Sequence, residues 1–266
     1  MGENKYTATD LKMMQQWPLE QKIQVAQTRI LEFGMHFDGK VFVAFSGGKD
    51  STVLLDLARR VYPDVPAVFV DTGLEYPEVK EFVKNHENVE VIRPKKTFRQ
   101  VIEEFGYPVI SKKIAGYVST AKRNPNSARA QFLRGEKDSK IFGFGDGKWS
   151  FLVDAPFKIS DWCCDVMKKQ PNHRYTKETG RYPILGTLAS ESIARRNNWM
   201  KSGCNLFDSD KPTCKPLSIW TDNDIFEYIK RFDIPYCPIY GEIVKDKKGN
   251  WTTTGVNRTG WKYSRA

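Results

Sequence analysis

The sequence lacks a long apolar segment. None of its hydrophobic runs approaches the roughly 20 residues that a membrane-spanning helix requires. The stretch Met1–Lys5 leads into polar sequence, without the apolar region of a secretory signal peptide. We therefore expect a cytoplasmic protein with no membrane partner.

Histidine is scarce, and cysteine is absent from the first half of the chain. The three histidines are widely separated: His36, His86 and His173. The five cysteines all lie in the second half: Cys163, Cys164, Cys204, Cys214 and Cys237. The scattered histidines indicate no catalytic triad. In a reducing compartment the cysteines are expected to be thiols or metal ligands rather than disulfides.

Internal repeats and low-complexity tracts are also absent, so the 266 residues are expected to form one large domain, or one domain with small additions. Hydrophobic residues make up 40%, which is enough for a sizeable core and too many for a disordered chain. The formal net charge is +10. This charge suits an anionic partner such as a nucleotide, sulfate or nucleic acid, although general surface charge is the simpler explanation.

Strands and helices alternate over much of the chain. An N-terminal helical segment is expected at 1–36, because apolar side chains recur there at helical spacing. Short apolar runs predict strands at 41–45, 66–70, 89–92 and 182–186. Helices are predicted from about residue 51 and at 77–84, 98–105, 190–199 and 221–232. This alternation predicts a doubly wound α/β fold with a mostly parallel, five-stranded sheet.

The expected domain organisation follows this alternation. Residues 37–200 are predicted to form the α/β domain, and 201–266 a helical or irregular extension packed on it. Within the domain, 111–150 is rich in lysine and arginine and has weak periodicity, so it is interpreted as an insertion or mobile lid. In a doubly wound sheet, ligands bind at the carboxyl ends of the strands, near the point where the strand order reverses.

The strongest local signal is a strand, a glycine-bearing turn and a helix in direct succession. The turn reads Ser46-Gly47-Gly48-Lys49-Asp50-Ser51. Paired glycines allow backbone N–H groups to approach an anion, and the N-terminus of the following helix adds donors and a positive dipole end. The serines supply hydroxyl groups and Lys49 supplies charge, while Asp50 either orders the loop or approaches a phosphate-bound Mg²⁺. The spacing differs from that of the Walker loop.

This turn, in the context Val43–Ser51, resembles the PP-loop of the ATP pyrophosphatases, the adenine nucleotide alpha-hydrolase-like superfamily. The segment Asp71-Thr72-Gly73 closes the next strand. It is similar to a segment beside the nucleotide in the branch that holds phosphoadenosine phosphosulfate reductases and the small subunit of bacterial ATP sulfurylase. The resemblance implies a Rossmann-like, PP-loop type of fold that binds an adenine nucleotide.

A third segment, Gly186–Ser192 followed by Arg195 and Arg196, resembles the part of this family that faces the anionic end of the ligand. Thr187 stands where many relatives have a basic residue, so the nature of the anion is left open. The resemblance extends over most of residues 38–260, and the PP-loop is its most specific motif.

The adjacent cysteines Cys163 and Cys164 resemble the iron–sulfur branch of the same family, which holds a four-iron cluster with a Cys-Cys pair and a later Cys-x-x-Cys. The later pair is replaced here by Trp261-Lys262-Tyr263-Ser264. Either Cys204 and Cys214 complete a different set of ligands, or these four cysteines are inert thiols. Reductases of the family also use a nucleophilic cysteine near the C-terminus, and no cysteine follows Cys237.

The leading interpretation is an enzyme of sulfur metabolism or sulfur transfer. It would bind ATP with Mg²⁺ on Ser46–Ser51, adenylylate an anionic acceptor and release pyrophosphate, by positioning and by charge stabilisation. The expected catalytic residues are Lys49, Asp50 and Arg195. The expected nucleotide contacts outside the PP-loop are Asp71, Thr72, Gly73 and Gly186.

Two alternatives remain open from the sequence. One is a reductase of adenylyl-sulfate or of its 3′-phosphorylated form. The other is a nucleotide-binding or nucleic-acid-associated protein without chemistry. In the leading interpretation the acceptor is also open, since sulfate, a sulfonucleotide or a nucleic acid would each supply the anionic group.

Overall fold

The computed structural model describes residues 4–136 and 147–256, and the chain divides into two compact units. The first, here called the sheet unit, comprises residues 4–71, 75–92 and 172–256. The second, the helical unit, comprises residues 72–74, 93–136 and 147–171. Each unit has a hydrophobic core of its own, so each is described by itself.

Two helices begin the sheet unit, α1 (Ala8–Gln15) and α2 (Leu19–His36). Thr7 caps α1, and its side chain accepts a hydrogen bond from the backbone N–H of Asp10. The Asp10 carboxylate accepts one in return from the Thr7 backbone N–H, which completes a capping box. The buried face of α2 includes Ala26, Ile30 and Phe33. The N-terminal helices predicted from the sequence are therefore present.

A six-stranded sheet forms the centre of this unit, in the order β3-β2-β1-β4-β6-β5. Its strands are β1 (Val41–Ala44), β2 (Ala67–Val70), β3 (Val89–Ile92), β4 (Tyr182–Leu185), β5 (Asn205–Leu206) and β6 (Thr213–Cys214). Every neighbouring pair is parallel except β5 and β6. The predicted doubly wound, mostly parallel fold is confirmed. The sheet has six strands, whereas five were predicted. The strands β5 and β6 are each two residues long, which is too short to give a periodic signal in the sequence.

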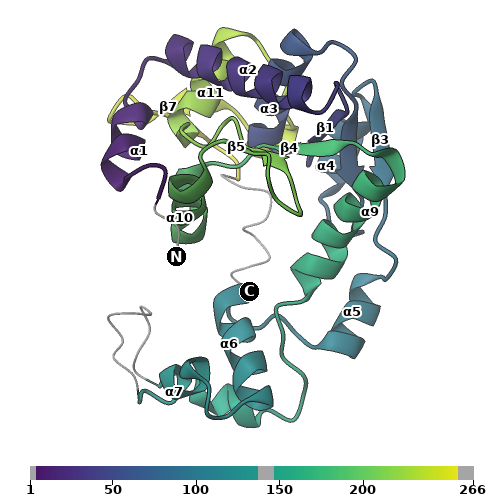
Figure 1. The fold of residues 1–266 in the computed structure, drawn as a ribbon, viewed down its shortest axis with the longest axis vertical. Helices are drawn as coiled ribbons and strands as arrows, with labels where there is room; N and C mark the ends of the chain where they lie inside the picture. The colour runs from purple at the N-terminus through teal and green to yellow at the C-terminus, as the bar shows by residue number, and fades with distance from the viewer. Residues whose placement is uncertain (1–3, 137–146, 257–266) are drawn as a thin grey trace. The chain divides into compact units, whose positions relative to one another are not determined.

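Helices and a small hairpin surround the sheet. They are α3 (Lys49–Val61), α4 (Pro77–Lys84), α9 (Gln170–Thr179), α10 (Ile193–Ser202), α11 (Asp222–Arg231), the short helices η3 (Ala189–Glu191) and η4 (Pro238–Tyr240), and the hairpin strands β7 (Ile243–Lys245) and β8 (Trp251–Thr253). Both α2 and α11 pack on α3 (Figure 1). A buried ion pair joins α2 to α11, with Lys22 Nζ 2.7 Å from Asp224 Oδ2. This contact holds the N-terminal helices and the C-terminal part of the unit together.

The helical unit contains three α-helices in its described part. Its elements are α5 (Phe98–Phe105), α6 (Lys112–Arg123), α7 (Ala128–Leu133) and the short helices η1 (Ser150–Asp154) and η2 (Asp165–Lys169). Ser111 and Ser127 cap α6 and α7 through side-chain hydrogen bonds. The described part of 111–150, expected to be an irregular insertion, is therefore largely helical. The unit also begins earlier, at residue 93, and ends later, at residue 171. No helix in residues 4–136 and 147–256 is long and apolar enough to cross a membrane.

A buried tyrosine links α11 to α3 and gives a testable stability effect. The Tyr228 hydroxyl donates a hydrogen bond of 2.5 Å to Asp56 Oδ2. Burial and this hydrogen bond raise the pKa of Tyr228. We expect Tyr228→Phe to lower the free energy of unfolding by about 1.5–3 kcal/mol, since hydrogen bonds to charged groups contribute about that much. Urea denaturation at pH 7 measures the loss.

The pH dependence of stability checks the same bond. The folded state keeps the Tyr228 proton above the ordinary tyrosine pKa of about 10, so stability falls as the pH rises beyond about 10. Tyr228→Phe should make this alkaline loss smaller. Tyr182→Phe serves as the control, because the Tyr182 hydroxyl makes no hydrogen bond within the described residues. An equal loss in both variants would contradict the assignment.

Candidate functional site

The loop after β1 turns sharply at a glycine and leads directly into α3. Gly47 has a φ of +69°, a left-handed conformation that side chains rarely adopt. A Cβ atom at Gly47 would also lie 2.9 Å from the side chains of both Val79 and Val83 on α4. Glycine is therefore required here for the turn and for the close packing of α4 against the loop.

The two serines hold the loop together. Their hydroxyl oxygens, Ser46 Oγ and Ser51 Oγ, lie 3.0 Å apart. The backbone N–H of Ser46 donates to Ser51 Oγ over 3.2 Å, and the Ser51 hydroxyl donates to the Gly48 carbonyl over 2.9 Å. These contacts fix the curvature of the loop before any ligand binds.

Several backbone N–H groups lie where the loop meets the N-terminus of α3. The N–H of Lys49 donates to the hydroxyl of Tyr240 over 3.0 Å. In the part of the chain that the structure describes, no hydrogen bond uses the N–H groups of Gly47, Asp50 or Ser51. The first N–H groups of a helix lack partners within the helix and point along the positive end of its dipole. This end of α3 is suited to an anionic group such as a phosphate or sulfate.

The Lys49 side chain lies between two carboxylates. The side chain is only 1% exposed, and its ammonium lies 2.7 Å from Asp50 Oδ1 and 2.6 Å from Asp222 Oδ1. Burial alone would lower the pKa of Lys49, but the two carboxylates outweigh it and raise that pKa above its ordinary value. The lysine is charged, and it ties the loop to the first residue of α11.

Gly186 brings a second strand against the loop. It follows β4, which pairs with β1 so that Ala44 lies beside Leu185. A Cβ atom at Gly186 would lie 3.1 Å from the Asp50 carbonyl oxygen. The strand order reverses between β1 and β4, with β2 and β3 on one side and β6 and β5 on the other. The loop therefore lies at the topological switch point, where doubly wound sheets bind ligands.

The other predicted site residues lie at the ends of neighbouring elements. Asp71 directly follows β2, and its carboxylate pairs with Lys80 Nζ at 2.8 Å. Next along the chain, Thr72 is buried and its hydroxyl accepts from the Leu74 N–H, while Gly73 has a φ of +81°. Arg195 lies in the first turn of α10 and pairs with Glu191.

Two residues of this site were not predicted from the sequence. Asp222 and Tyr240 approach the loop from positions more than 170 residues further along the chain. The capping box of Thr221 and Asp224 marks the start of α11. No local pattern indicates that the first residue of this helix contacts Lys49.

Comparison with known proteins agrees with this arrangement. The family model of the phosphoadenosine phosphosulfate reductase domain matches residues 40–113 and 134–246, which is more than half of the chain. The match includes β1, the loop, β2 and β4. The chain belongs to this family. The resemblance inferred from Ser46–Ser51 is thereby confirmed.

Individual members and neighbours of the family differ in length and similarity. An uncharacterized protein of Methanocaldococcus jannaschii is 42% identical over 212 residues, which cover 75% of this chain and 33% of that protein. The phosphoadenosine 5′-phosphosulfate reductase of Alkalilimnicola ehrlichii is 23% identical over 222 residues, covering 82% of this chain and 71% of that one. Among solved structures, phosphoadenylyl-sulfate reductase of Candida auris has a TM-score of 0.47 at 15% identity, with 94% and 100% of the two chains covered. The chain spans about a third of the length of its M. jannaschii relatives.

The predicted iron–sulfur ligands of this family member are divided between the two units. In the sheet unit, Cys204 directly precedes β5 and Cys214 ends β6, and the Cys214 thiol contacts the Arg29 carbonyl. Cys163 and Cys164 belong to the helical unit and precede η2. Burial raises the pKa of Cys163, Cys204 and Cys214, which favours neutral thiols.

A four-iron cluster is held by thiolates, typically four of them. Within either unit, the described residues form no group of three or more cysteine, histidine or carboxylate side chains able to hold a metal ion. The cysteines that each unit provides do not fit such a cluster.

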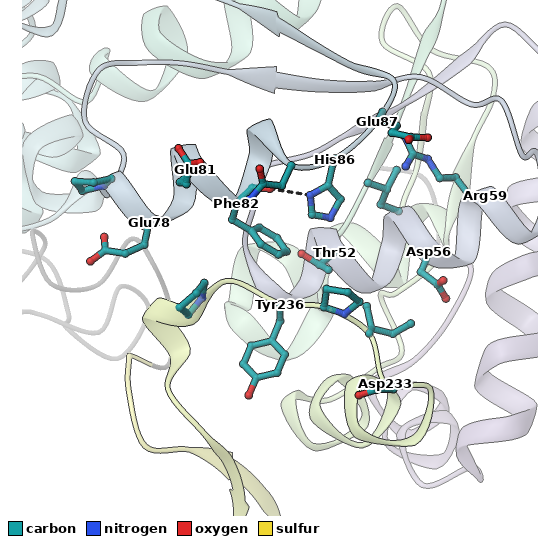
Figure 2. Close-up of a pocket in the computed structure, with 16 residues that line it drawn as sticks. Thr52, Asp56, Arg59, Glu78, Glu81, Phe82, His86, Glu87, Asp233 and Tyr236 are labelled. Carbon is teal, nitrogen blue, oxygen red and sulfur yellow. Dashed lines mark hydrogen bonds between the residues drawn. The ribbon is translucent and has the colours of Figure 1, made fainter.

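The sheet unit also has an acidic groove of about 1250 Å³ between α3, α4 and the segment 233–238 (Figure 2). Five carboxylate residues line it: Asp56, Glu78, Glu81, Glu87 and Asp233. Among the lining residues, Arg59 and His86 carry basic side-chain nitrogens. No residue of Ser46–Ser51 lines this groove. Because the carboxylates repel phosphate, the loop and not the groove is the candidate site for the anionic end of a nucleotide.

Proposed function

We propose that the sheet unit binds an adenine nucleotide at the carboxyl ends of β1, β2 and β4. The phosphates or sulfate would bind the N–H groups of Gly47, Asp50 and Ser51. The single observation that supports this most strongly is the left-handed Gly47 turn, which directs backbone donors and the N-terminus of α3 to one place. Asp71 and Gly186 would border the same site from the neighbouring strands.

The reaction we favour is adenylylation. An oxygen of an anionic acceptor would attack the α-phosphorus of ATP, the bond from that phosphorus to the bridging oxygen would break, and pyrophosphate would leave with its electrons. The loop N–H groups would stabilise the charge on the leaving pyrophosphate. Lys49 pairs with Asp50 and Asp222, so it would offset their negative charge beside the phosphates. Arg195 would require release from Glu191 before it could contact an anion.

Mg²⁺ would enter this site with the nucleotide. The carboxylate of the loop, Asp50, pairs with Lys49, so the phosphates themselves would supply most of the oxygen ligands. The metal would neutralise phosphate charge. We propose Lys49 and Asp50 as residues that hold the loop in shape, in addition to their electrostatic effect on the phosphates.

A second candidate is reduction of a sulfonucleotide, and the names of the relatives favour it. The protein of A. ehrlichii is a phosphoadenosine 5′-phosphosulfate reductase, and one of Halalkalibacterium halodurans with 26% identity is an adenosine 5′-phosphosulfate reductase. Such chemistry requires a reactive thiolate. In the described part of the sheet unit, burial raises the pKa of Cys204, Cys214 and Cys237 alike, which disfavours thiolates. We therefore place adenylylation first.

One set of assays separates the two reactions. Isothermal titration with Mg²⁺–ATP, adenylyl-sulfate and its 3′-phosphorylated form measures binding. Exchange of labelled pyrophosphate into ATP, with sulfate or RNA as the acceptor, detects adenylylation, whereas sulfite release with a thiol reductant detects reduction. We expect binding of ATP and pyrophosphate exchange. Sulfite release without exchange would overturn adenylylation in favour of reduction, and no binding of any ligand at millimolar concentration would overturn both.

A further inference from the structure

The net positive charge of the chain is concentrated in the helical unit. Residues 93–171 contain 16 lysines and arginines against eight aspartates and glutamates, so this stretch carries eight of the ten net charges. Between Glu104 and Glu136 there are six of these cations and no acidic residue. Several of these cations pair with carboxylates, as Arg134 does with Glu136, and the Asp161 carboxylate lies beside Gly116 of α6. The remaining excess of positive charge repels itself, and a bound polyanion relieves that repulsion. The unit is therefore suited to an anionic partner.

Exposed aromatic rings gather in the same unit. Four aromatic side chains are more than 40% exposed: Tyr107 (48%), Phe151 (62%), Phe157 (42%) and Trp162 (42%). In residues 4–136 and 147–256, every exposed aromatic side chain belongs to the helical unit. The exposed large apolar residues of the sheet unit are instead aliphatic: Met13, Leu31, Met35, Val91 and Ile193. Rings gathered on one unit indicate a contact surface rather than scattered exposure.

The rings form two pairs on two segments that run side by side. The backbone N–H of Tyr107 donates to the Lys158 carbonyl over 2.8 Å, and the Ser160 N–H donates to the Tyr107 carbonyl over 3.2 Å. The Tyr107 and Phe157 rings meet edge to face with centroids 5.7 Å apart. The Phe105 and Trp162 rings stack with centroids 5.6 Å apart. The backbone pairing thus holds four aromatic rings in a fixed arrangement.

Two lysines of α6 lie near the aromatic segment. The Lys122 ammonium donates to the Phe157 carbonyl over 3.2 Å and to the Ala155 carbonyl over 2.8 Å, which fixes α6 against the aromatic segment. Lys112 lies close enough to Cys163, beside Trp162, to interact with it electrostatically. Lys112 and Arg123 are eleven residues apart, about three turns, so they lie on the same face of α6.

We propose that this surface, made of Tyr107, Phe157, Trp162, Lys112, Lys122 and Arg123 and here called the aromatic–basic surface, binds single-stranded nucleic acid. Unpaired bases stack on the exposed rings, and phosphates pair with the cations. A duplex hides the faces of its bases and makes no use of the rings. The inference deepens the proposed function by selecting nucleic acid among its anionic partners, yet binding at this surface needs no adenine nucleotide.

Fluorescence anisotropy with the full chain tests the proposal, using labelled 20-nucleotide RNA and DNA of mixed sequence and no added nucleotide. We expect binding that weakens as the salt concentration rises. Lys112→Glu/Arg123→Glu should weaken it by about 10-fold or more and flatten the dependence of log affinity on log salt. Tyr107→Ala/Phe157→Ala should weaken it by about 5- to 100-fold while leaving the salt slope unchanged.

Matched variants on the sheet unit provide the controls. Lys247→Glu/Lys248→Glu makes the same charge change in the exposed turn between β7 and β8, and should weaken binding by less than about 2-fold. Tyr107→Leu/Phe157→Leu replaces the alanine variant if circular dichroism shows that the latter is unfolded.

Three results would overturn the proposal: no binding at low salt, equal weakening by Lys247→Glu/Lys248→Glu, or tighter binding to a duplex of the same sequence or to phosphatidylserine vesicles. None of these bears on ATP binding at Ser46–Ser51, so failure here and failure of the proposed function are distinguishable.

Discussion

Gly47→Val is expected to abolish nucleotide binding. In the parent protein, a nucleotide at 100 times its dissociation constant should raise the free energy of unfolding by about 2.7 kcal/mol. The valine side chain would enter the space of Val79 and Val83 and force the turn out of its left-handed conformation. The N–H groups of the loop would no longer point to one place. Urea denaturation with and without Mg²⁺–ATP and the two sulfonucleotides measures the effect.

The control for this experiment is Gly39→Val. Gly39 has a similar φ of +72°, but a Cβ atom there would meet no atom within 4 Å. Both variants incur the cost of a side chain at positive φ, and only Gly47→Val disturbs the loop. Gly47→Ala, which adds a single carbon, replaces it if the valine variant does not fold. A Gly47 variant that keeps the full nucleotide-dependent stabilisation would show that the phosphates bind elsewhere.

Removal of both carboxylates around Lys49 should lower the free energy of unfolding by more than Tyr228→Phe does. Asp50→Asn/Asp222→Asn leaves the Lys49 side chain, which is 1% exposed, without either of its two counter-charges. Breaking a buried ion pair in this way costs about 3–5 kcal/mol. The triple variant that adds Lys49→Met should recover most of this loss, because it removes the buried charge as well. Urea denaturation of the parent, double and triple variants at pH 7 measures the loss and the recovery of the free energy of unfolding.

The pH dependence distinguishes this effect from a general loss of packing. In the parent, the pKa of Lys49 is raised, so its contribution is complete below the unfolded pKa of about 10.4 and is lost as the pH rises through the higher folded value. In the double variant only burial remains, which lowers the folded pKa below the unfolded one. Its stability should therefore increase between pH 7 and pH 10. A double variant within about 1 kcal/mol of the parent, with the same pH profile, would contradict the role given to Lys49.

Most elements with a strong local pattern could be predicted from the sequence. The helix at 77–84 begins at a proline and the helix at 98–105 has strong periodicity, and both have the predicted bounds. The same is true of the strand at 89–92. The strands β5 and β6 were missed because each pairs over only two residues, and pairing partners are not encoded locally. The helices of 111–150 were not predicted, because the many lysines and arginines in this stretch weaken its apolar periodicity.

The sequence by itself determined the family and the position of the loop. A strand that ends in Ser46-Gly47-Gly48 and leads into a helix is a continuous segment, so its geometry depends mainly on neighbouring residues. Only the tertiary structure decided what surrounds Lys49, because Asp222 approaches from 173 residues further along the chain. It also decided that the predicted cysteine ligands belong to two units, and that the rings of Tyr107 and Phe157 meet. Contacts between distant segments follow from packing of the whole chain, and no local pattern of residue types specifies them.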